Sequence, residues 1–337
     1  MNLTHQTLLI TGIGGFIGLR AAEMALARGM QVRGLDLSPT AAAAAQRLGS
    51  DVIVGDTADP DAAARACAGV DVVLHTAAIV GEDGDWPRYR RVNVDGTATM
   101  AQAALAAGVQ AFVHLSSVMV YGFHYPDQIA ETGPRRGENN PYCQTKIEGE
   151  DALRRLHQEH GLPLILIRPG DVYGPRSAPW VVRPLQLMRR GLFMLPDGGR
   201  GVINHLFVDT LIEGVLRAVE REAIGRVYNL SDGVATTWRA YFDHLAQIGG
   251  QRRPPALPAG LLKRVVAGLA AGERVLGRPP SALPAGVDFI NRPHAVSMAA
   301  ARADLQFAPA IDLAEGMRRV QAWLHTAEGQ QVVWGRG

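Results

Sequence analysis

The stretch Thr11-Gly12-Ile13-Gly14-Gly15-Phe16-Ile17-Gly18 decides the fold of this chain. An apolar run, Leu8-Leu9-Ile10, precedes it and a helical pattern follows it, which indicates a strand that turns directly into a helix. Such a turn leaves backbone N–H groups and the positive end of a helix dipole facing one point, and glycine lets a ligand approach the backbone. We therefore predict a pyrophosphate site, with a glycine-rich turn without ligand as the alternative. The glycines Gly12, Gly15 and Gly18 are not spaced as in the Gly-x-Gly-x-x-Gly pattern, so their position at the first strand carries the prediction.

A second short strand supports this interpretation. Gln31-Val32-Arg33-Gly34-Leu35-Asp36 is expected to form a short strand that ends in an acid. An acid at the end of the second strand, about twenty residues after the glycine turn, is where dinucleotide-binding folds place the acceptor for the ribose hydroxyls.

Composition and charge exclude several classes of protein. The 337 residues, 47% of them hydrophobic, suffice for a dinucleotide-binding domain and a smaller second lobe. The formal charge is +2 without a dense block of like charge, so we expect neither a nucleic-acid interface nor a polybasic membrane patch. Cys67 and Cys143 have no metal-ligand spacing, and we expect no metal. The first strand is expected to begin by residue 7, which leaves no room for a signal peptide. The longest apolar segment that could span a membrane, residues 257–276, carries four charges. We therefore expect a cytoplasmic protein without a transmembrane segment.

Short apolar runs alternate with helical patterns along the first half of the chain. Continuous Val, Ile and Leu runs indicate strands buried on both faces, and alternation with helices implies parallel crossovers. We predict an α/β fold with a doubly wound parallel sheet, the Rossmann fold. The dinucleotide-binding domain is expected over residues 1–170 with returning segments near 202–230, and a mainly substrate-binding lobe over residues 171–337. The predicted strands are 51–55, 71–76, 110–116 and 162–168; the predicted helices are 59–68, 87–107, 141–160, 179–190, 209–221, 236–248 and 313–325, with order fading from residue 328.

The residues after each strand are the candidates for ligand contact, because ligands of such sheets lie beyond the carboxyl ends of the strands. Asp56-Thr57 follow the third strand, and Asp56 either accepts a hydrogen bond from an adenine amino group or caps the next helix. Ala77-Ala78 are small enough for a cofactor to lie against the backbone. Ser116-Ser117 supply hydroxyls that can hold a substrate oxygen, with a cap at the end of the strand as the alternative for either serine.

Tyr142 and Lys146 form the candidate reacting pair. Asn139-Asn140-Pro141 predicts a helix start, and residues four apart project from one face of a helix. A phenol that accepts a proton at neutral pH needs its pKa lowered by roughly three units, and an adjacent ammonium acts in that direction. Seven tyrosines and two lysines give about 0.04 chance pairs at this spacing, so a surface lysine on an ordinary helix is the weaker alternative.

The chain resembles the extended short-chain dehydrogenase/reductase family, which includes nucleotide-sugar epimerases, dehydratases and 3β-hydroxysteroid dehydrogenases. The resemblance is carried by the motifs above together with His75-Thr76-Ala77-Ala78, Asn93, Val120-Tyr121-Gly122 and the segment 168–175. The resemblance implies Tyr142 as acid/base, Lys146 as its activator and ribose ligand, and Ser117 as the serine that positions the substrate. It implies a homodimer through the helices at 87–107 and 141–160. Asp36 favours NAD over NADP, because a carboxylate repels a 2′-phosphate. The implied cofactor contacts are Gly12, Gly15, Phe16, Ile17, Gly18, Asp36, Asp56, Thr57, Ala77, Ala78, Tyr142, Lys146 and Pro169.

Departures from the family pattern bear on the substrate. Val118 and Met119 stand where sugar 4,6-dehydratases have an Asp-Glu pair, so dehydration is not expected. Asp171 replaces an asparagine that faces a diphosphate in many nucleotide-sugar enzymes, and a carboxylate there repels that group. Arg292, by contrast, stands where sugar epimerases often bind phosphate, and it could equally be a surface or carboxylate-binding residue. The amphipathic residues 257–276, with Met188, Phe193 and Met194, indicate either an apolar pocket or ordinary core.

We therefore expect an NAD-dependent enzyme that interconverts a secondary alcohol and a ketone on a small, largely apolar molecule, steroid-like or lipid-derived. The first alternative is a nucleotide-sugar 4-epimerase of the UDP-hexose type. The second is a cofactor-loaded binding module without turnover, which has no need of Ser117, Tyr142 and Lys146 together.

Overall fold

The central feature is a seven-stranded parallel sheet in the order β11-β6-β5-β4-β1-β2-β3. The computed structural model describes residues 1–81, 85–275, 277 and 284–335. The order reverses between β1 and β4, which lie side by side, so the predicted doubly wound fold is confirmed. The strands are β1 (Thr7–Thr11), β2 (Gln31–Asp36), β3 (Asp51–Val54), β4 (Val72–His75), β5 (Ala111–Leu115), β6 (Leu164–Pro169) and β11 (Val227–Leu230).

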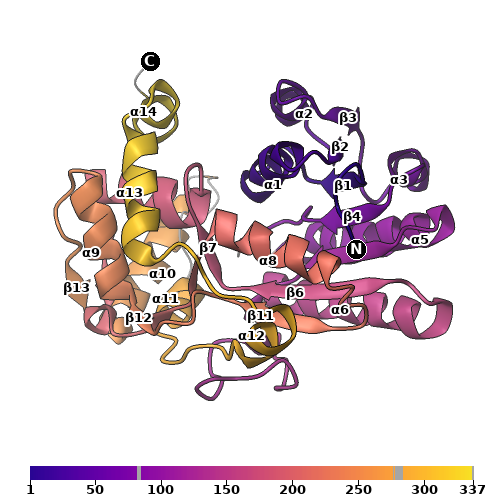
Figure 1. The fold of residues 1–337 in the computed structure, drawn as a ribbon. Coiled ribbons are helices and arrows are strands. Elements are labelled where there is room, and N and C mark those ends of the chain that lie inside the picture. The colour runs from indigo at the N-terminus through magenta and orange to yellow at the C-terminus, as the bar shows by residue number, and fades with distance from the viewer. Residues whose placement is uncertain (82–84, 276, 278–283, 336–337) are drawn as a thin grey trace.

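Helices cover both faces of this sheet (Figure 1). One buried apolar cluster joins a face of the sheet to α1 (Phe16–Ala27), α2 (Pro39–Gln46) and α8 (Val208–Glu220). The other cluster joins the opposite face to α3 (Pro60–Cys67), α5 (Gly96–Ala107) and α6 (Pro141–His160). The predicted helix at 87–107 is interrupted: α4 (Trp86–Arg90) leads into a π-helical turn, η1 (Arg91–Asp95), before α5.

Most remaining elements follow β6. They are β7 (Asp171–Tyr173), η3 (Ala178–Val182), α7 (Arg183–Arg189), β8 (Leu195–Pro196), η4 (Asp197–Gly199), β9 (Val202–Ile203), β10 (His205–Phe207), β12 (Thr236–Thr237), α9 (Trp238–Ile248), β13 (Ala256–Leu257), α10 (Ala259–Val275), α11 (Pro284–Ile290), α12 (Ala299–Leu305), α13 (Leu313–Leu324) and α14 (Ala327–Trp334). Figure 1 shows α9, α10, α11 and α13 together on one side of the molecule. The expected loss of order from residue 328 is wrong, because Thr326 caps α14 through the Gly329 N–H. The division into two lobes at residue 170 stays a prediction.

Helix α10 forms neither the apolar pocket nor the ordinary core that its sequence indicates. Leu262 and Ala270 are buried, whereas Leu261, Val265 and Leu269 are exposed, so most of its large apolar side chains neither fill the core nor roof a pocket. Leu276, at the end of the predicted segment, lies outside the described residues, as do residues 336–337. In the part of the chain that the structure describes, no helix is both long and apolar enough to span a membrane.

Candidate active site

The glycine turn between β1 and α1 has the shape that a pyrophosphate requires. Gly12 has φ +65°, and a Cβ there would lie 3.1 Å from the Ala77 Cα. A Cβ on Gly18 would lie 2.3 Å from the Gly12 carbonyl oxygen, so glycine lets α1 start directly against the turn. No side chain caps α1 and its first turn holds no acid, which leaves the positive helix end available to an anion. The residues present therefore fit the phosphates of a dinucleotide.

Asp36 lies beside this turn at the end of β2. Its Oδ2 accepts a hydrogen bond from the Gly14 N–H at 2.9 Å and its Oδ1 accepts one from the Ser38 N–H at 2.9 Å. These bonds orient the carboxylate, and each oxygen keeps a second lone pair. The arrangement is suited to a ribose diol.

Asp56 is more occupied than the sequence suggests. Its carboxylate accepts hydrogen bonds from the Ala58 N–H at 2.9 Å and from Arg91 at 2.5 Å. The alternative that Asp56 caps the next helix is wrong, because Asp59 caps α3. The other predicted cofactor contacts lie at strand ends: Thr57 is buried after β3, Ala77 and Ala78 follow β4, and Pro169 ends β6.

The start of α6 places Tyr142 and Lys146. The Asn140 side chain accepts hydrogen bonds from the N–H groups of Tyr142 and Cys143, and Pro141 occupies the first turn, as predicted. Lys146 is buried, and its Nζ donates to the Leu115 carbonyl oxygen at 2.7 Å. This bond ties the ammonium to the end of β5. Burial lowers the pKa of Lys146 to about 8, against the opposing effect of Glu150.

The pKa of Tyr142 moves in the direction opposite to that expected. Burial raises it to about 12, while hydrogen bonding to Ser117 opposes the rise. The physical reason is that Tyr142 packs against an apolar cluster of Met119, Phe123 and Cys143, which disfavours a phenolate. The chain's own residues therefore keep the phenol neutral at pH 7.

Two neutral histidines lie near the Lys146 ammonium. His75 bonds Thr11 through Nδ1 at 2.8 Å and Thr97 through Nε2 at 2.9 Å. Burial, with Lys146 adding to it, lowers the pKa of His75 to about 3 and that of His114 well below its ordinary value. The rings of His75 and His114 stack 5.4 Å apart. Lys146 therefore has uncharged imidazoles as neighbours.

The structure separates the roles of the two serines. Ser116 donates to Glu150 at 2.6 Å in the interior, whereas the Ser117 hydroxyl accepts from the Met119 N–H at 3.1 Å at the start of η2 (Val118–Tyr121). Of the two serines, Ser117 is the one whose hydroxyl influences the Tyr142 phenol, where it opposes the rise of the pKa. Ser116 therefore belongs to a structural network, whereas the role of Ser117 beside Tyr142 stays a prediction.

Sequence reasoning missed Glu150, the centre of that network. Arg168 on β6 holds its carboxylate through Nε at 2.8 Å and Nη2 at 2.6 Å, and both side chains are buried. Although burial raises the pKa of Glu150, Arg168 and Ser116 hold it below its ordinary value. The sequence carried a signal that could have found Glu150: Tyr142, Lys146 and Glu150 follow one another at intervals of four, which places them on one face of α6.

Asn93 in η1 has a positioning role that its motif did not reveal. Its side chain accepts from the Ile79 N–H at 2.8 Å and donates to the Ile79 carbonyl at 3.1 Å. It also donates to Thr145 on α6 at 3.1 Å. Asn93 therefore links the segment after Ala78 to the helix that carries Tyr142.

Asp171 corrects one expectation about the substrate, and Arg292 proves to be the carboxylate-binding residue of the two alternatives to a phosphate ligand. They form a buried ion pair, with Arg292 Nη2 2.7 Å from Asp171 Oδ2, and Asp171 also accepts from the Asn204 N–H at 2.9 Å. The Arg292 guanidinium lies 3.9 Å from the centre of the Phe289 ring. Asp171 is therefore no unpaired charge that repels a ligand, and Arg292 is no unpaired cation that awaits a phosphate.

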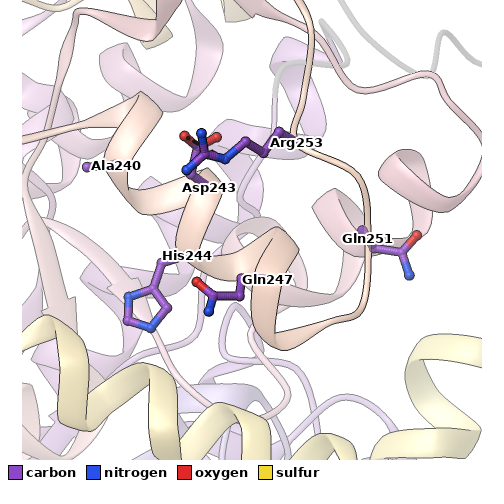
Figure 2. Close-up of a pocket in the computed structure, with 6 residues that line it drawn as sticks. All are labelled: Ala240, Asp243, His244, Gln247, Gln251 and Arg253. Carbon is purple, nitrogen blue, oxygen red and sulfur yellow. Dashed lines mark ion pairs between the residues drawn. The ribbon is translucent and has the colours of Figure 1, made fainter.

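A hollow of about 570 Å³ lies elsewhere, on α9 (Figure 2). Asp243 and Arg253 form an ion pair there at 3.6 Å. None of the predicted site residues lines it; its lining is Ala240, Asp243, His244, Gln247, Gln251 and Arg253. Within the described ranges, no group of three or more His, Cys, Asp or Glu residues is placed to hold a metal ion.

Comparisons with known proteins show the family to which the chain belongs. Residues 8–231 match the model of the NAD dependent epimerase/dehydratase family. The chain is 30% identical to a 2-alkyl-3-oxoalkanoate reductase of Stenotrophomonas maltophilia, covering 94% of this chain and 98% of the relative. It is 28% identical to a 3-beta-hydroxysteroid dehydrogenase of Mycolicibacterium neoaurum, covering 92% and 88%. The fold is similar to that of the UDP-glucose 4-epimerase of Thermotoga maritima, with a TM-score of 0.78, 22% identity, and 95% and 98% coverage.

Proposed function

We propose a reaction for this chain from its family: it belongs to the NAD-dependent epimerase/dehydratase family and is an NAD-dependent enzyme of the extended short-chain dehydrogenase/reductase type. In this proposal it interconverts a secondary alcohol and a ketone on a largely apolar, steroid-like or lipid-derived molecule. The buried Asp171–Arg292 pair carries this proposal. A guanidinium that is already neutralised and packed on Phe289 gains little from a diphosphate. The surroundings of Tyr142 are apolar, which suits a hydrocarbon substrate.

In the proposed site, each polar side chain has one role. Ser117 holds the substrate oxygen by a hydrogen bond, and the Tyr142 hydroxyl exchanges a proton with that oxygen. Lys146, tied to the Leu115 carbonyl, holds a positive charge beside the phenol. When bound, NAD supplies the two-electron acceptor and a positively charged ring near Tyr142. Because the chain alone raises the pKa of Tyr142, the phenol depends on that second positive charge to ionise.

The same proposal assigns the cofactor contacts. Gly12, Gly15 and the first turn of α1, with Phe16, Ile17 and Gly18, hold the pyrophosphate. Asp36, oriented by the Gly14 N–H, would accept from the adenosine ribose, and Lys146 and Tyr142 would hold the other ribose. Asp56, Thr57, Ala77, Ala78 and Pro169 complete the contacts at the strand ends.

Incubation of the purified protein with NAD and candidate alcohols tests the reaction. We expect net formation of NADH with hydroxysteroids or long-chain 3-hydroxy compounds, and none with UDP-hexoses. Interconversion of two UDP-hexoses without net NADH would instead establish the 4-epimerase, the alternative that shares this fold.

The variant Tyr142→Phe separates an enzyme from a binding module. We expect its turnover to fall at least a hundredfold while NAD binding is kept, because general acid–base catalysis contributes about 10²–10⁴-fold. Unchanged turnover in Tyr142→Phe would eliminate the acid/base role.

We also propose a cytoplasmic homodimer formed through α4, α5 and α6. Helices α5 and α6 lie on the face of the sheet that α8 does not cover, and α4 contacts α6. Sedimentation is expected to give the mass of two chains, and a single chain at all concentrations would refute the dimer.

A further inference from the structure

The segment that carries Ala77 and Ala78, where the cofactor is expected to lie, is held at both ends by hydrogen bonds. At one end, the Ala77 N–H donates to Thr11 Oγ1 at 3.2 Å. At the other end, the Asn93 side chain accepts from the Ile79 N–H at 2.8 Å and donates to the Ile79 carbonyl oxygen at 3.1 Å. The place of this segment therefore depends on Thr11 of β1 and on Asn93 of η1.

His75 joins these two ends through the interior. Its Nδ1 lies 2.8 Å from Thr11 Oγ1, and its Nε2 lies 2.9 Å from Thr97 Oγ1. Thr97 in turn donates to the Asn93 carbonyl oxygen at 2.9 Å. At most 1% of each of these four residues is exposed. Together they form one closed network, which consists of Thr11, His75, Thr97, Asn93 and residues 77–79.

The donors and acceptors of the closed network fit a single tautomer of His75. The Thr97 hydroxyl uses its hydrogen for the Asn93 carbonyl, so it accepts from His75 Nε2–H. Nδ1 then carries no hydrogen and accepts from the Thr11 hydroxyl, whose oxygen accepts from the Ala77 N–H. Every donor thus points from Ala77 toward Asn93, and a break at any one bond leaves a buried polar group without its partner.

The closed network also reaches the helix that carries the reacting pair. The Asn93 amide donates to Thr145 Oγ1 at 3.1 Å, and Thr145 donates to the Pro141 carbonyl oxygen at 2.6 Å. Thr145 directly precedes Lys146 on α6. A displacement of Asn93 would therefore move both the segment of Ala77 and the start of α6.

We propose that His75 is a positioning residue through which the buried Thr97, on α5, contributes to the binding of NAD. Through Thr11, which directly precedes Gly12, His75 holds the glycine turn. Through Thr97 it holds Asn93, and with it the far end of residues 77–79. Without the imidazole the two ends become independent, and NAD must order them as it binds, which lowers its affinity. The proposal concerns the cofactor alone and does not rest on the proposed reaction.

Calorimetric titration of the full chain with NAD tests this role. We expect His75→Phe to lower the NAD affinity about tenfold. The matched control is His114→Phe, because His114 is equally buried, lies opposite His75 on β5 and stacks on its ring. Neither ring nitrogen of His114 has a hydrogen-bond partner in the part of the chain that the structure describes. We expect the control to keep the wild-type NAD affinity within about twofold.

Thr97→Val tests the same network away from the cofactor. It removes the hydroxyl and keeps a branched side chain, at a residue outside the expected cofactor contacts. We expect the NAD affinity to fall by about threefold to tenfold. The double variant with His75→Phe should lose no more affinity than His75→Phe alone, because both substitutions cut one network. A merely structural role would lower the melting temperature and leave the NAD affinity of the folded protein unchanged.

Circular dichroism melting establishes which variants are folded at the temperature of the titration. A folded His75→Phe that binds NAD as tightly as His114→Phe would overturn the proposal. Wild-type affinity in Thr97→Val, or additive losses in the double variant, would overturn it as well. If His75→Phe does not fold, the NAD affinity of Thr97→Val decides by itself.

Discussion

Lys146 combines two properties that rarely occur together in one residue. It is one of two lysines among 34 basic residues, and it is buried with its Nζ bonded to the Leu115 carbonyl. A compact ammonium fits this position between a strand end and a phenol, whereas a planar guanidinium has a different shape. Burial makes the charge unfavourable for folding, so we infer that the residue is retained for the site and not for stability.

The variant Lys146→Met tests that inference. The pKa of Lys146 is lowered from 10.5 to about 8 in the folded protein, so between these values the unfolded chain binds more protons and stability rises with pH. At pH 7 we expect Lys146→Met to raise the free energy of unfolding of the cofactor-free protein by about 1–3 kcal/mol, net of the lost hydrogen bond. Urea unfolding at several pH values measures it. The advantage of the variant should shrink toward pH 10.5, and an advantage that does not change with pH would contradict the assignment.

Helix α6 is the element that assembles the site. Its first turn is set locally by Asn140 and Pro141, and its position on the sheet is set by Glu150, which Arg168 and Ser116 hold in the interior. Tyr142 lies two turns before Glu150 on this helix. Loss of the Glu150 contacts should therefore shift the phenol relative to Ser117.

We expect Glu150→Gln to destabilise the protein by about 3–5 kcal/mol, because it leaves Arg168 charged and buried without a carboxylate. Glu148→Gln is the matched control on the same helix, since Glu148 pairs with the exposed Arg90, and we expect a change of at most about 1 kcal/mol. Denaturant unfolding at pH 7 compares them. The pKa of Glu150 is below its ordinary value of 4.5, so its contribution is present above that pH and is lost as the pH falls below it. Equal effects of the two variants would contradict the network.

Helix α1 provides a second prediction at this scale. In Gly18→Ala the new Cβ would lie 2.3 Å from the Gly12 carbonyl and 2.7 Å from the Ile13 Cα, so the helix must move away from the turn. We expect a loss of about 1–3 kcal/mol in stability and at least a tenfold loss in NAD affinity. The control is Gly268→Ala in α10, where there is open space and a helical alanine is expected to stabilise by up to about 1 kcal/mol. Calorimetric titration with NAD, together with thermal melting, measures both effects.

At the scale of the whole molecule, the reversal of strand order brings the site together. β1 and β4 are neighbours, while β2 and β3 extend to one side and β5, β6 and β11 to the other. The glycine turn, Asp36 and Ala77 therefore meet at one edge of the sheet, although the sequence separates them by tens of residues. The Ala77 N–H reaches Thr11 Oγ1 at 3.2 Å across this edge.

A ligand held across that edge must stabilise the whole fold. We expect NAD at 100 times its dissociation constant to raise the free energy of unfolding by about 2.7 kcal/mol. NADP at the same concentration should stabilise less, because the Asp36 carboxylate faces the ribose that carries the extra phosphate. In Asp36→Ser the ratio of the affinity for NAD to the affinity for NADP should fall at least tenfold. Thermal melting with each cofactor checks this, and equal stabilisation of the wild-type protein by NAD and NADP would refute the role of Asp36.

Local pattern was enough for much of this fold. β2 and α6 have the predicted bounds, because Asp36 marks the end of β2 and Asn140 with Pro141 marks the start of α6. α2 was missed because residues 41–45 are all alanine and have no apolar periodicity. The π-helical turn η1 was missed because its hydrogen-bond pattern leaves no trace in residue spacing.

By itself, the amino-acid sequence determined the parallel sheet, the glycine turn, Asp36 and the Tyr142–Lys146 spacing, because each follows from neighbours within a few turns of chain. The tertiary structure alone decided that Asp171 pairs with Arg292, 121 residues away, and that Arg168 pairs with Glu150 in the interior. It also decided that Leu261 and Leu269 of α10 are exposed while Leu262 is buried, and that Tyr142 has a raised pKa. Burial and charge pairing depend on which distant segments pack together, and residue spacing does not specify that packing.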